Sequence, residues 1–218
     1  CLNKLSASEF SREELRFAME KLGVQARRAG HIIRHIHDFV RKSEPKLAAC
    51  NLVEVIQDSI GFISADARAR SVRIVGKIAD TSVNLYADRV MLEQVLLNLA
   101  RNAIQAMSGT PPPLRSLRFS ASLALSCDKV IFSVADHSCG IAPGVAPRLY
   151  TPFFTTKSEG MGLGLSLCRT VVEQHGGTLT HEANEPQGTV FSFTLPVAVA
   201  GQAEPFEDGA IKKMADFH

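Results

Sequence analysis

The hydrophobic pattern of this chain changes at Pro45, and that change constrains its fold more than any other feature. Before Pro45, apolar residues recur at alternating steps of four and three, which is the heptad repeat of a coiled-coil helix. The repeat is formed by Leu15, Met19, Leu22, Ala26, Ala29, Ile33, Ile36 and Val40. After Pro45, the chain alternates between helix-like and strand-like periods. The sequence therefore predicts two regions of different architecture.

The heptad helix needs a partner, because a single helix of this length is only marginally stable in water. Ser11 and Glu14 form the capping box expected at its start, and Pro45 ends it. We expect residues 1–46 to hold the end of one helix and then this second helix, which together form a dimerising helical hairpin. The alternative is an ordinary amphipathic helix that lies on the second region.

Residues 48–197 are predicted to form one domain of three helices and six strands. The expected helix caps and helix ends are Asn51 with Glu54, Asp88, about Met107 and about Gln174. The strand-like runs are SVRIVGKI, VNLY, SLRFSASLAL, KVIFSVAD, TLTHEA and TVFSFTL. Several strands form hairpins and the helices cluster between them, so the predicted class is α+β, a two-layer sandwich of a mixed β-sheet with helices on one face. Residues 198–218 are expected to form a C-terminal tail.

The composition argues against several classes of function. Apolar residues make up 45% of the chain, and the formal net charge of +2 is too small to favour nucleic acid or a membrane surface as a partner. No apolar run approaches the ~20 residues that span a bilayer, and the first residues do not form a signal peptide. Five cysteines without a CxxC pair favour a reducing compartment. Because the sequence begins without methionine, inside a helix-like pattern, we expect a piece of a longer protein.

Residues 157–167, KSEGMGLGLSL, hold three glycines in alternate positions, Gly160, Gly162 and Gly164. Glycines this dense usually let the main chain approach a ligand closely, and that ligand is often a phosphate. The run is not a Walker loop, because Leu165 stands where that loop needs lysine. It is not the dinucleotide fingerprint either, because no glycine lies three places after the second one.

A polar stripe follows the helix predicted to begin after Asp88. The stripe is formed by Gln94, Asn98, Arg101, Asn102 and Gln105, and the buried face is expected to be Leu92, Leu96, Leu99, Ala103 and Ala106. A solvated helix face usually carries Glu and Lys, whereas Asn costs roughly 0.5–0.7 kcal/mol relative to Ala inside a helix. Two Asn residues four apart therefore suggest a ligand, because carboxamide oxygens can coordinate Mg²⁺ together with nucleotide phosphates and water. A plain solvated face is the alternative.

Two further motifs come later in the chain. A predicted strand ends at Asp136 and turns at Gly140, where a carboxylate can accept a hydrogen bond from an exocyclic amine such as that of adenine. The run TPFFTTK then places two aromatic residues next to Lys157, whose cation can reach toward phosphates. The alternatives are a common Asp-to-Gly turn, a hydrophobic plug and a surface lysine.

The succession of these motifs resembles the catalytic and ATP-binding domain of bacterial sensor histidine kinases. An Asn-bearing helix is followed by Asp-x-x-x-Gly-Ile, Pro-Phe-Phe-Thr-Thr-Lys, Gly-x-Gly-Leu-Gly-Leu, and Gly-Thr before the last strand. These kinases share the Bergerat-type ATP-binding fold with gyrase, the heat-shock chaperones and MutL-type mismatch-repair proteins. The resemblance covers residues 48–197 and is strongest to the oxygen- and dicarboxylate-sensing kinases, whose lid is short, here KSEG.

The resemblance implies ATP and Mg²⁺ as cofactors and gives roles to matching positions. Asn102 would be the main Mg²⁺ ligand and Asn98 its helper, both catalytic, while Asp136 would bind adenine beside Thr189. The implied ATP-binding residues are Asn98, Arg101, Asn102, Gln105, Asp136, Gly140, Ile141, Phe154, Thr155, Thr156, Lys157, Gly160, Met161, Gly162, Leu163, Gly164, Leu165 and Thr189. The glycine loop would wrap the triphosphate, and Leu163 and Leu165 would hold that loop on the core.

Asn98 separates a kinase from an ATP hydrolase within this superfamily. The water-splitting members place a Glu four residues before the metal-binding Asn as general base, and a carboxamide cannot take a proton from water. A neutral imidazole needs no such base to accept a phosphoryl group. The resemblance therefore implies a histidine protein kinase that dimerises through the hairpin, passes its phosphoryl group to a response-regulator aspartate, and works in a bacterial cytoplasm. A serine-directed kinase of the same fold is a further alternative.

Ser138 departs from the family pattern, because it replaces a glycine of the first glycine box. If that position requires a positive φ, strain of roughly 1–3 kcal/mol would weaken nucleotide binding. The alternative function is then a dimeric scaffold of the same fold whose nucleotide binding is impaired.

The histidines depart from the pattern as well. The acceptor histidine of the family precedes an acidic residue and, a few places on, a proline. Only His37, among His31, His35 and His37, precedes an acid, Asp38, and no proline follows. His31 and His35 could bind zinc or belong to an exposed basic face, and His175 is expected at a helix end. We therefore expect the phosphoacceptor histidine upstream of this chain.

Overall fold

The computed structural model describes residues 12–13, 15–23, 45–78, 84–125, 128–157 and 160–197. It divides the chain into two compact units, residues 1–44 and residues 45–218. The heptad region belongs to the first unit, and the ATP-binding motifs belong to the second.

In the first unit, residues 15–23 are helical, as the heptad repeat predicts. The first three residues of the repeat, Leu15, Met19 and Leu22, are 49%, 66% and 68% exposed. An exposed apolar seam is what a helix presents when it pairs with another helix. The rest of the repeat, from Ala26 to Val40, lies outside the described residues, as do the three histidines between 31 and 37.

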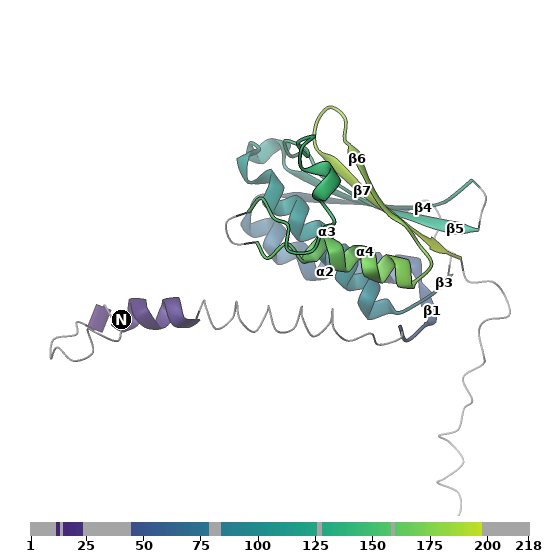
Figure 1. The fold of residues 1–218 in the computed structure, drawn as a ribbon, viewed down its shortest axis with the longest axis horizontal. Helices are drawn as coiled ribbons and strands as arrows, with labels where there is room; N and C mark the ends of the chain where they lie inside the picture. Colours follow the sequence, from purple (N-terminus) through teal and green to yellow (C-terminus); the bar gives the residue numbers. More distant parts are fainter. Residues whose placement is uncertain are drawn as a thin grey trace, which may run out of the picture. The chain divides into compact units, whose positions relative to one another are not determined.

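A mixed five-stranded sheet forms one layer of the second unit (Figure 1). Its strand order is β2 (Arg73–Ile78), β4 (Ser116–Leu123), β5 (Lys129–Ala135), β7 (Thr189–Pro196) and β6 (Leu179–Ala183). β2 runs parallel to β4, and the other neighbouring pairs are antiparallel. The two hairpins predicted from the sequence, β4–β5 and β6–β7, are both present.

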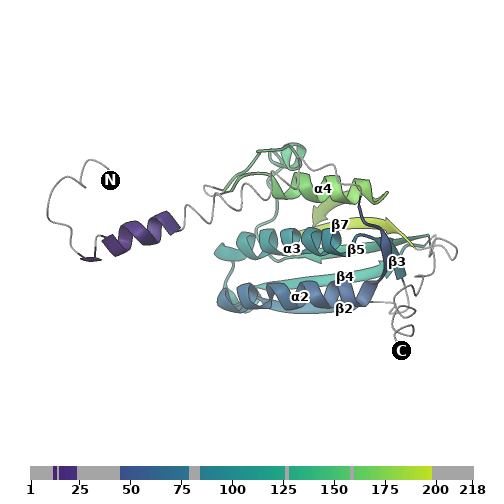
Figure 2. The ribbon, with the colours of Figure 1, turned by 90° about the horizontal axis from the view of Figure 1, so that it is seen from below.

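Three helices cover one face of this sheet: α2 (Leu52–Ala69), α3 (Arg89–Ala106) and α4 (Gly164–Gln174) (Figure 2). Side chains cap the first two as predicted, because Asn51 Oδ1 accepts from the Val53 amide at 2.8 Å and Asp88 Oδ1 from the Met91 amide at 3.1 Å. Short 3-10 helices are η2 (Met107–Gly109), η3 (Pro112–Leu114) and η4 (Ala146–Arg148). The predicted α+β sandwich is confirmed.

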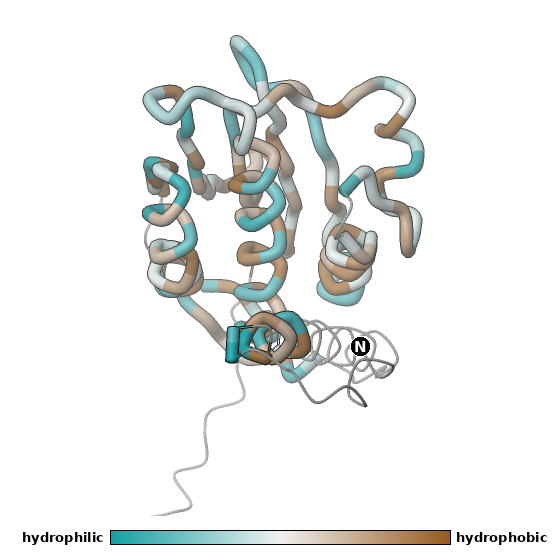
Figure 3. The backbone as a smooth tube through the Cα atoms, turned by 90° about the vertical axis from the view of Figure 1, so that its left-hand side faces the viewer, coloured by the Kyte–Doolittle hydropathy of each residue, from teal (hydrophilic) through white to brown (hydrophobic). Residues whose placement is uncertain are grey.

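The core lies between the sheet and the helices, and α3 is its central helix. α3 packs against α2 on one side and α4 on the other. From the sheet, Phe132 and Phe193 stack with ring centroids 4.7 Å apart, and from α3 Leu92, Leu96 and Leu99 are fully buried. Hydrophilic and hydrophobic residues alternate around each helix (Figure 3), as expected for helices with one apolar face. Burial on three sides fixes the orientation of the polar edge of α3.

The prediction for one residue of the buried face of α3, Ala106, is wrong. Ala106 is exposed, whereas Met107, the next residue, is fully buried. Met107 follows the buried residues Ala103 and Ile104 at steps of four and three, so regular helix spacing already places it on the buried face where the α-helix passes into η2. The face predicted from regular helix spacing holds up to Ala103, which is buried.

A short strand was also missed. β1 (Ala48–Asn51) pairs antiparallel with β3 (Asn84–Ala87) in a separate two-stranded sheet, with Ala48 opposite Ala87. In the sequence, this segment lies between Pro45, which ends the heptad helix, and the helix cap at Asn51, and it belongs to none of the strand-like runs. Its residues, AACN, carry no strand periodicity, and pairing with β3 is what makes them extended.

His175 does end α4, as predicted, but it also joins two helices. It is buried, with 7% of its surface exposed, and its Nδ1 lies 2.7 Å from the Val171 carbonyl oxygen. Its Nε2 accepts a hydrogen bond of 3.0 Å from the amide of Asp88, the N-cap of α3. Because Nε2 accepts there, the proton sits on Nδ1 and is donated to Val171. This histidine therefore holds the end of α4 against the start of α3.

Candidate functional site

The polar edge of α3 faces the segment before the glycine loop. The Lys157 ammonium donates to Asn102 Oδ1 at 3.0 Å and to Gln105 Oε1 at 2.6 Å. On the other side of the same carboxamide, Asn102 Nδ2 lies 3.8 Å from the point where a side chain would begin at Gly164. The structure thus brings together four of the residues implied by the sequence, Asn102, Gln105, Lys157 and Gly164.

The cation in this contact faces neutral oxygens. No carboxylate lies within ion-pair distance of Lys157 in the described ranges. Loss of water around the ammonium lowers the pKa of Lys157, although the residue as a whole is exposed. Two carboxamide oxygens of one helix therefore already hold a cation, so this donor set fits a hard cation such as Mg²⁺.

Asn98 lies one turn before Asn102 and is half-buried. Burial raises the pKa of the Cys168 thiol on α4 to about 12, and a hydrogen bond from the Asn98 side chain acts against that rise. The neutral thiol donates to the Val95 carbonyl at 3.8 Å. The Lys157 ammonium bonds to Asn102 and Gln105, further along α3, and not to Asn98.

Arg101 points away from this group. Its guanidinium lies 3.9 Å from the Asp66 carboxylate of α2, and both side chains are about half exposed. This partner lies on α2, and the role of Arg101 at the phosphates, which the resemblance implies, stays a prediction.

The glycine loop packs against the PFFTTK segment through main-chain contacts. Gly162 has φ +67°, and a side chain there would overlap the main chain of Phe153 and Phe154. The Phe153 amide donates to the Gly162 carbonyl at 2.9 Å, and Phe153 itself has φ +65°. A side chain at Gly160 would overlap the Thr155 hydroxyl. Only glycine lets these two segments lie this close together.

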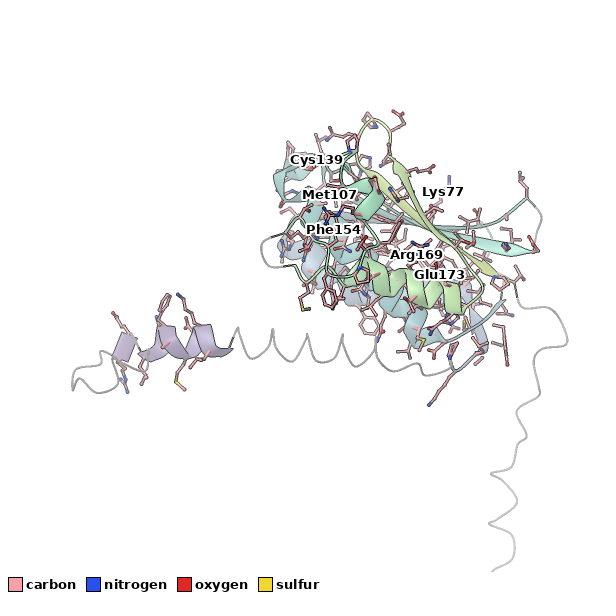
Figure 4. The ribbon with its side chains drawn as sticks, viewed as in Figure 1. Lys77, Met107, Cys139, Phe154, Arg169 and Glu173 are labelled. Atoms are coloured by element: carbon pink, nitrogen blue, oxygen red, sulfur yellow. The ribbon has the colours of Figure 1, made fainter. Side chains whose placement is uncertain are left out.

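The remaining implied residues of this region surround the same contact. Phe154, labelled in Figure 4, lies under the Arg148 guanidinium at 4.3 Å. Leu163 is buried and Leu165 is half-buried and packs against the core, as predicted for the structural half of the glycine motif. Ile141 is half-buried and packs against the core as well. Thr155 and Thr156 are exposed, and Met161 is half-buried.

A second group of residues forms where β5 ends. Asp136 is 2% exposed, and its Oδ1 accepts hydrogen bonds from the amides of Ser138 at 2.9 Å and Thr189 at 3.2 Å. Within the described ranges, no donor reaches its other oxygen, Oδ2. The structure thus brings together Asp136 and Thr189, as predicted, and leaves one carboxylate oxygen of a buried residue available to a ligand.

Two residues that were not predicted to belong to the site, Asn184 and Gly188, hold Asp136 in place. Asn184 Nδ2 donates to the Asp136 carbonyl at 2.7 Å, and a side chain at Gly188 would overlap that same carbonyl. A Gly-Thr pair before the last strand was the available signal for Gly188. No sequence signal marks Asn184, because its contact depends on how the β6–β7 loop folds over the end of β5.

The predicted strain at Ser138 is absent. Ser71 and Phe153 are the described non-glycine residues with positive φ, so Ser138 does not require the conformation on which that prediction depended. Ser138 is 1% exposed, and its hydroxyl accepts a hydrogen bond of 3.2 Å from the Gly140 amide. Gly140 carries the positive φ, +79°, of this turn. Serine therefore fits the backbone of the first glycine box, and backbone strain gives no support to the scaffold alternative.

Within the described residues, no helix is long and apolar enough to cross a bilayer. The same residues contain no group of three or more His, Cys, Asp and Glu side chains that could hold a metal ion.

Residues 87–199, more than half of the chain, match the family described as histidine kinase-, DNA gyrase B-, and HSP90-like ATPase. The chain belongs to this family. Its histidine kinase branch is indicated by the catalytic domain of the histidine kinase ThkA, which is 30% identical, with a TM-score of 0.62 over 69% of this chain and 95% of that domain. A second structure, of ThkA in complex with the response regulator protein TrrA, has the same fold (TM-score 0.72, 24% identity, 90% of this chain and 55% of that one).

Two sensor proteins are similar in sequence. The C4-dicarboxylate transport sensor protein DctS of Rhodobacter capsulatus is 42% identical over 92% of this chain. The sensor protein FixL of Bradyrhizobium diazoefficiens is 38% identical over 83% of it. The chain spans about a third of these relatives, 30% of DctS and 35% of FixL. The resemblance to sensor histidine kinases, and to these two groups of them, is confirmed.

Replacing Gly162 with alanine should destabilise the protein by at least about 1–3 kcal/mol, because alanine is strained at this φ and its Cβ overlaps the Phe153 main chain. Urea unfolding followed by circular dichroism measures the loss. Gly144→Ala is the matched control, because nothing lies within 4 Å of a Cβ at Gly144. Equal stability of the two variants would show that the glycine loop tolerates side chains.

Proposed function

We propose that this chain is the catalytic core of a histidine protein kinase that binds Mg·ATP between α3 and the glycine loop. The observation that carries the proposal is the contact of two α3 carboxamides with a cation, directly beside main chain that only glycine can form. A binding place for a cation next to a glycine backbone without side chains is what a metal-bound triphosphate requires.

Each part of the nucleotide has a matching group in the chain. Asp136 Oδ2 would accept a hydrogen bond from the adenine amine, with Thr189 beside it. Asn102 would hold the metal with Asn98 as its helper, and Mg²⁺ would neutralise charge on the phosphates. The amides of the glycine loop and the first turn of α4 would face the triphosphate, because the start of a helix is electropositive.

The reaction proposed is transfer of the γ-phosphoryl group of ATP to a histidine. The chain has a carboxamide, Asn98, where a hydrolase of this superfamily would need a carboxylate base, so water is not activated there. A neutral imidazole attacks without such a base, and the site then acts by positioning and charge neutralisation. Because none of the histidines at 31, 35 and 37 has the neighbours of the acceptor, we place the acceptor histidine outside this chain.

The partners proposed are a second copy of the protein and a response regulator. The exposed apolar seam of residues 15–22 supports dimerisation through helices, because such a seam is stable only when covered. ThkA, a histidine kinase of the same fold, has been solved with its response regulator, which supports relay to a receiver aspartate. The signal sensed by the whole protein would come from other parts of it.

Replacing Asn102 with alanine should abolish the contribution of Mg²⁺ to ATP affinity, because this substitution removes the main carboxamide seat. The melting temperature without nucleotide should change little, since the Asn102 contact is at the surface. Calorimetric titration of ATP, with Mg²⁺ and with chelator, measures the effect. Gln94→Ala, on an exposed position of the same helix, is the matched control. Unchanged Mg²⁺ dependence in Asn102→Ala would contradict the proposal.

Replacing Asp136 with asparagine should shift the preference from ATP toward ITP. The asparagine Oδ1 can still accept from the Ser138 and Thr189 amides, so its Nδ2 must point at the base. That donor opposes the amine of adenine and suits the carbonyl of hypoxanthine. The ratio of ITP to ATP affinity should rise about tenfold, as expected for one mismatched hydrogen bond. If both nucleotides weaken equally, Asp136 does not contact the base.

A further inference from the structure

Lys157 occupies an unusual place for a lysine of a phosphate site. Its ammonium is bound by Asn102 and Gln105, at 3.0 Å and 2.6 Å, and no described carboxylate pairs with it. An ammonium donates hydrogen bonds and accepts none, so it binds to acceptor atoms such as these two oxygens. The Lys157 side chain thus contacts α3 itself and does not extend away from the protein toward an incoming phosphate.

The oxygens that hold this ammonium are those a divalent cation would use. Oδ1 of Asn102 is the proposed metal ligand, and it already accepts a hydrogen bond from Lys157. An ammonium 3.0 Å from this oxygen and a divalent ion about 2 Å from it would lie at most about 5 Å apart, where like charges repel. Metal binding at Asn102 therefore favours departure of the ammonium.

The main chain of Lys157 stays anchored while its side chain can move. Its amide donates to the Thr155 hydroxyl at 3.1 Å, and its carbonyl accepts from the Gly160 amide at 3.2 Å. These bonds connect Lys157 directly to the glycine loop. A side chain that leaves the carboxamides therefore remains next to the place where the phosphates are proposed to bind.

We propose that Lys157 is a tethered cation that occupies the carboxamide seat until the divalent metal displaces it. This inference rests on the proposed function, because the ion that displaces the ammonium is the Mg²⁺ of the proposed Mg·ATP complex. Lys157 is then a positioning residue whose side chain has two positions. Without metal it holds the α3 carboxamides in a cation-binding arrangement and supplies one positive charge near the phosphates. With metal its side chain leaves the carboxamides, while its main chain stays anchored to Thr155 and Gly160.

The competing explanation is that Lys157 only contacts phosphates, beside the metal and independently of it. The two explanations differ in how the effects of the lysine and of the metal on ATP affinity combine. Independent contacts lower ATP affinity by the same factor with and without Mg²⁺ when the lysine is removed. If the lysine and the metal occupy the same carboxamides in turn, that factor differs between the two conditions, because each cation substitutes in part for the other.

The test measures ATP affinity of the wild type and of Lys157→Met by calorimetry, with Mg²⁺ and with chelator. Lys157→Met should lose most of its affinity in chelator and less with Mg²⁺, so the affinity ratio between the two conditions should rise about fivefold or more. Lys77→Met is the matched control, since Lys77 is an exposed residue of β2 that lies far from Phe154 and its segment (Figure 4). Lys157→Arg, which keeps the charge, should stay near the wild-type ratio. An equal loss in both conditions overturns the proposal.

A second readout needs no nucleotide. In the protein without ATP, Lys157→Met should shift the side-chain amide resonances of both Asn102 and Gln105, and Lys77→Met should shift neither. Unshifted resonances in Lys157→Met would show that the ammonium does not occupy the seat and would overturn the inference. If these resonances do shift but the wild type binds ATP in neither condition, the proposed function fails and the contact alone stands.

Discussion

The site depends on the position of one helix, α3, which is held on three sides and open on the fourth. α2 and α4 pack on its flanks and the sheet lies beneath, so its leucines are fully buried. The bond from the Asp88 amide to His175 fixes its start against the end of α4. Because the helix cannot rotate without exposing this core, the carboxamides of its fourth side face the glycine loop. Packing thereby determines where a cation can bind.

Glycine residues determine how closely the main chain packs on the other side of the site. Gly162 and Gly160 allow the loop to lie against the PFFTTK segment, and the ammonium of Lys157 in that segment reaches the carboxamides of α3. At the far end, Gly188 lets the β6–β7 loop approach Asp136 and hold its carboxylate. Small residues thus permit the contacts, while the ionisable and carboxamide side chains supply the chemistry.

Much of the fold could be predicted because its elements have strong local signals. The hairpins alternate with period two, and Asn51 and Asp88 cap helices exactly where apolar spacing begins. β1 could not be predicted, because AACN becomes a strand only through its pairing with β3. Ala106 was predicted wrongly because the buried face of α3 is broader than the five residues chosen for it: Ala100 and Ile104 are also buried, and Met107 follows them at helical spacing.

The residues of the candidate site could be predicted from the sequence better than the contacts among them. The motifs pointed to Asn102, Gln105, Lys157 and the glycines, and the structure brings these together. Spacing could not show that Arg101 faces α2, nor that the Lys157 ammonium lies on carboxamides 55 and 52 positions earlier in the chain. Ser138 was misjudged because the positive φ of its turn belongs to Gly140.

The most direct test of the account is a crystal structure of the protein with Mg²⁺ and a non-hydrolysable ATP analogue. We expect a metal ion bound to the side-chain oxygen of Asn102, the glycine loop around the triphosphate, and the base against Asp136. A nucleotide bound elsewhere, or a metal ion that leaves the α3 carboxamides untouched, would contradict it.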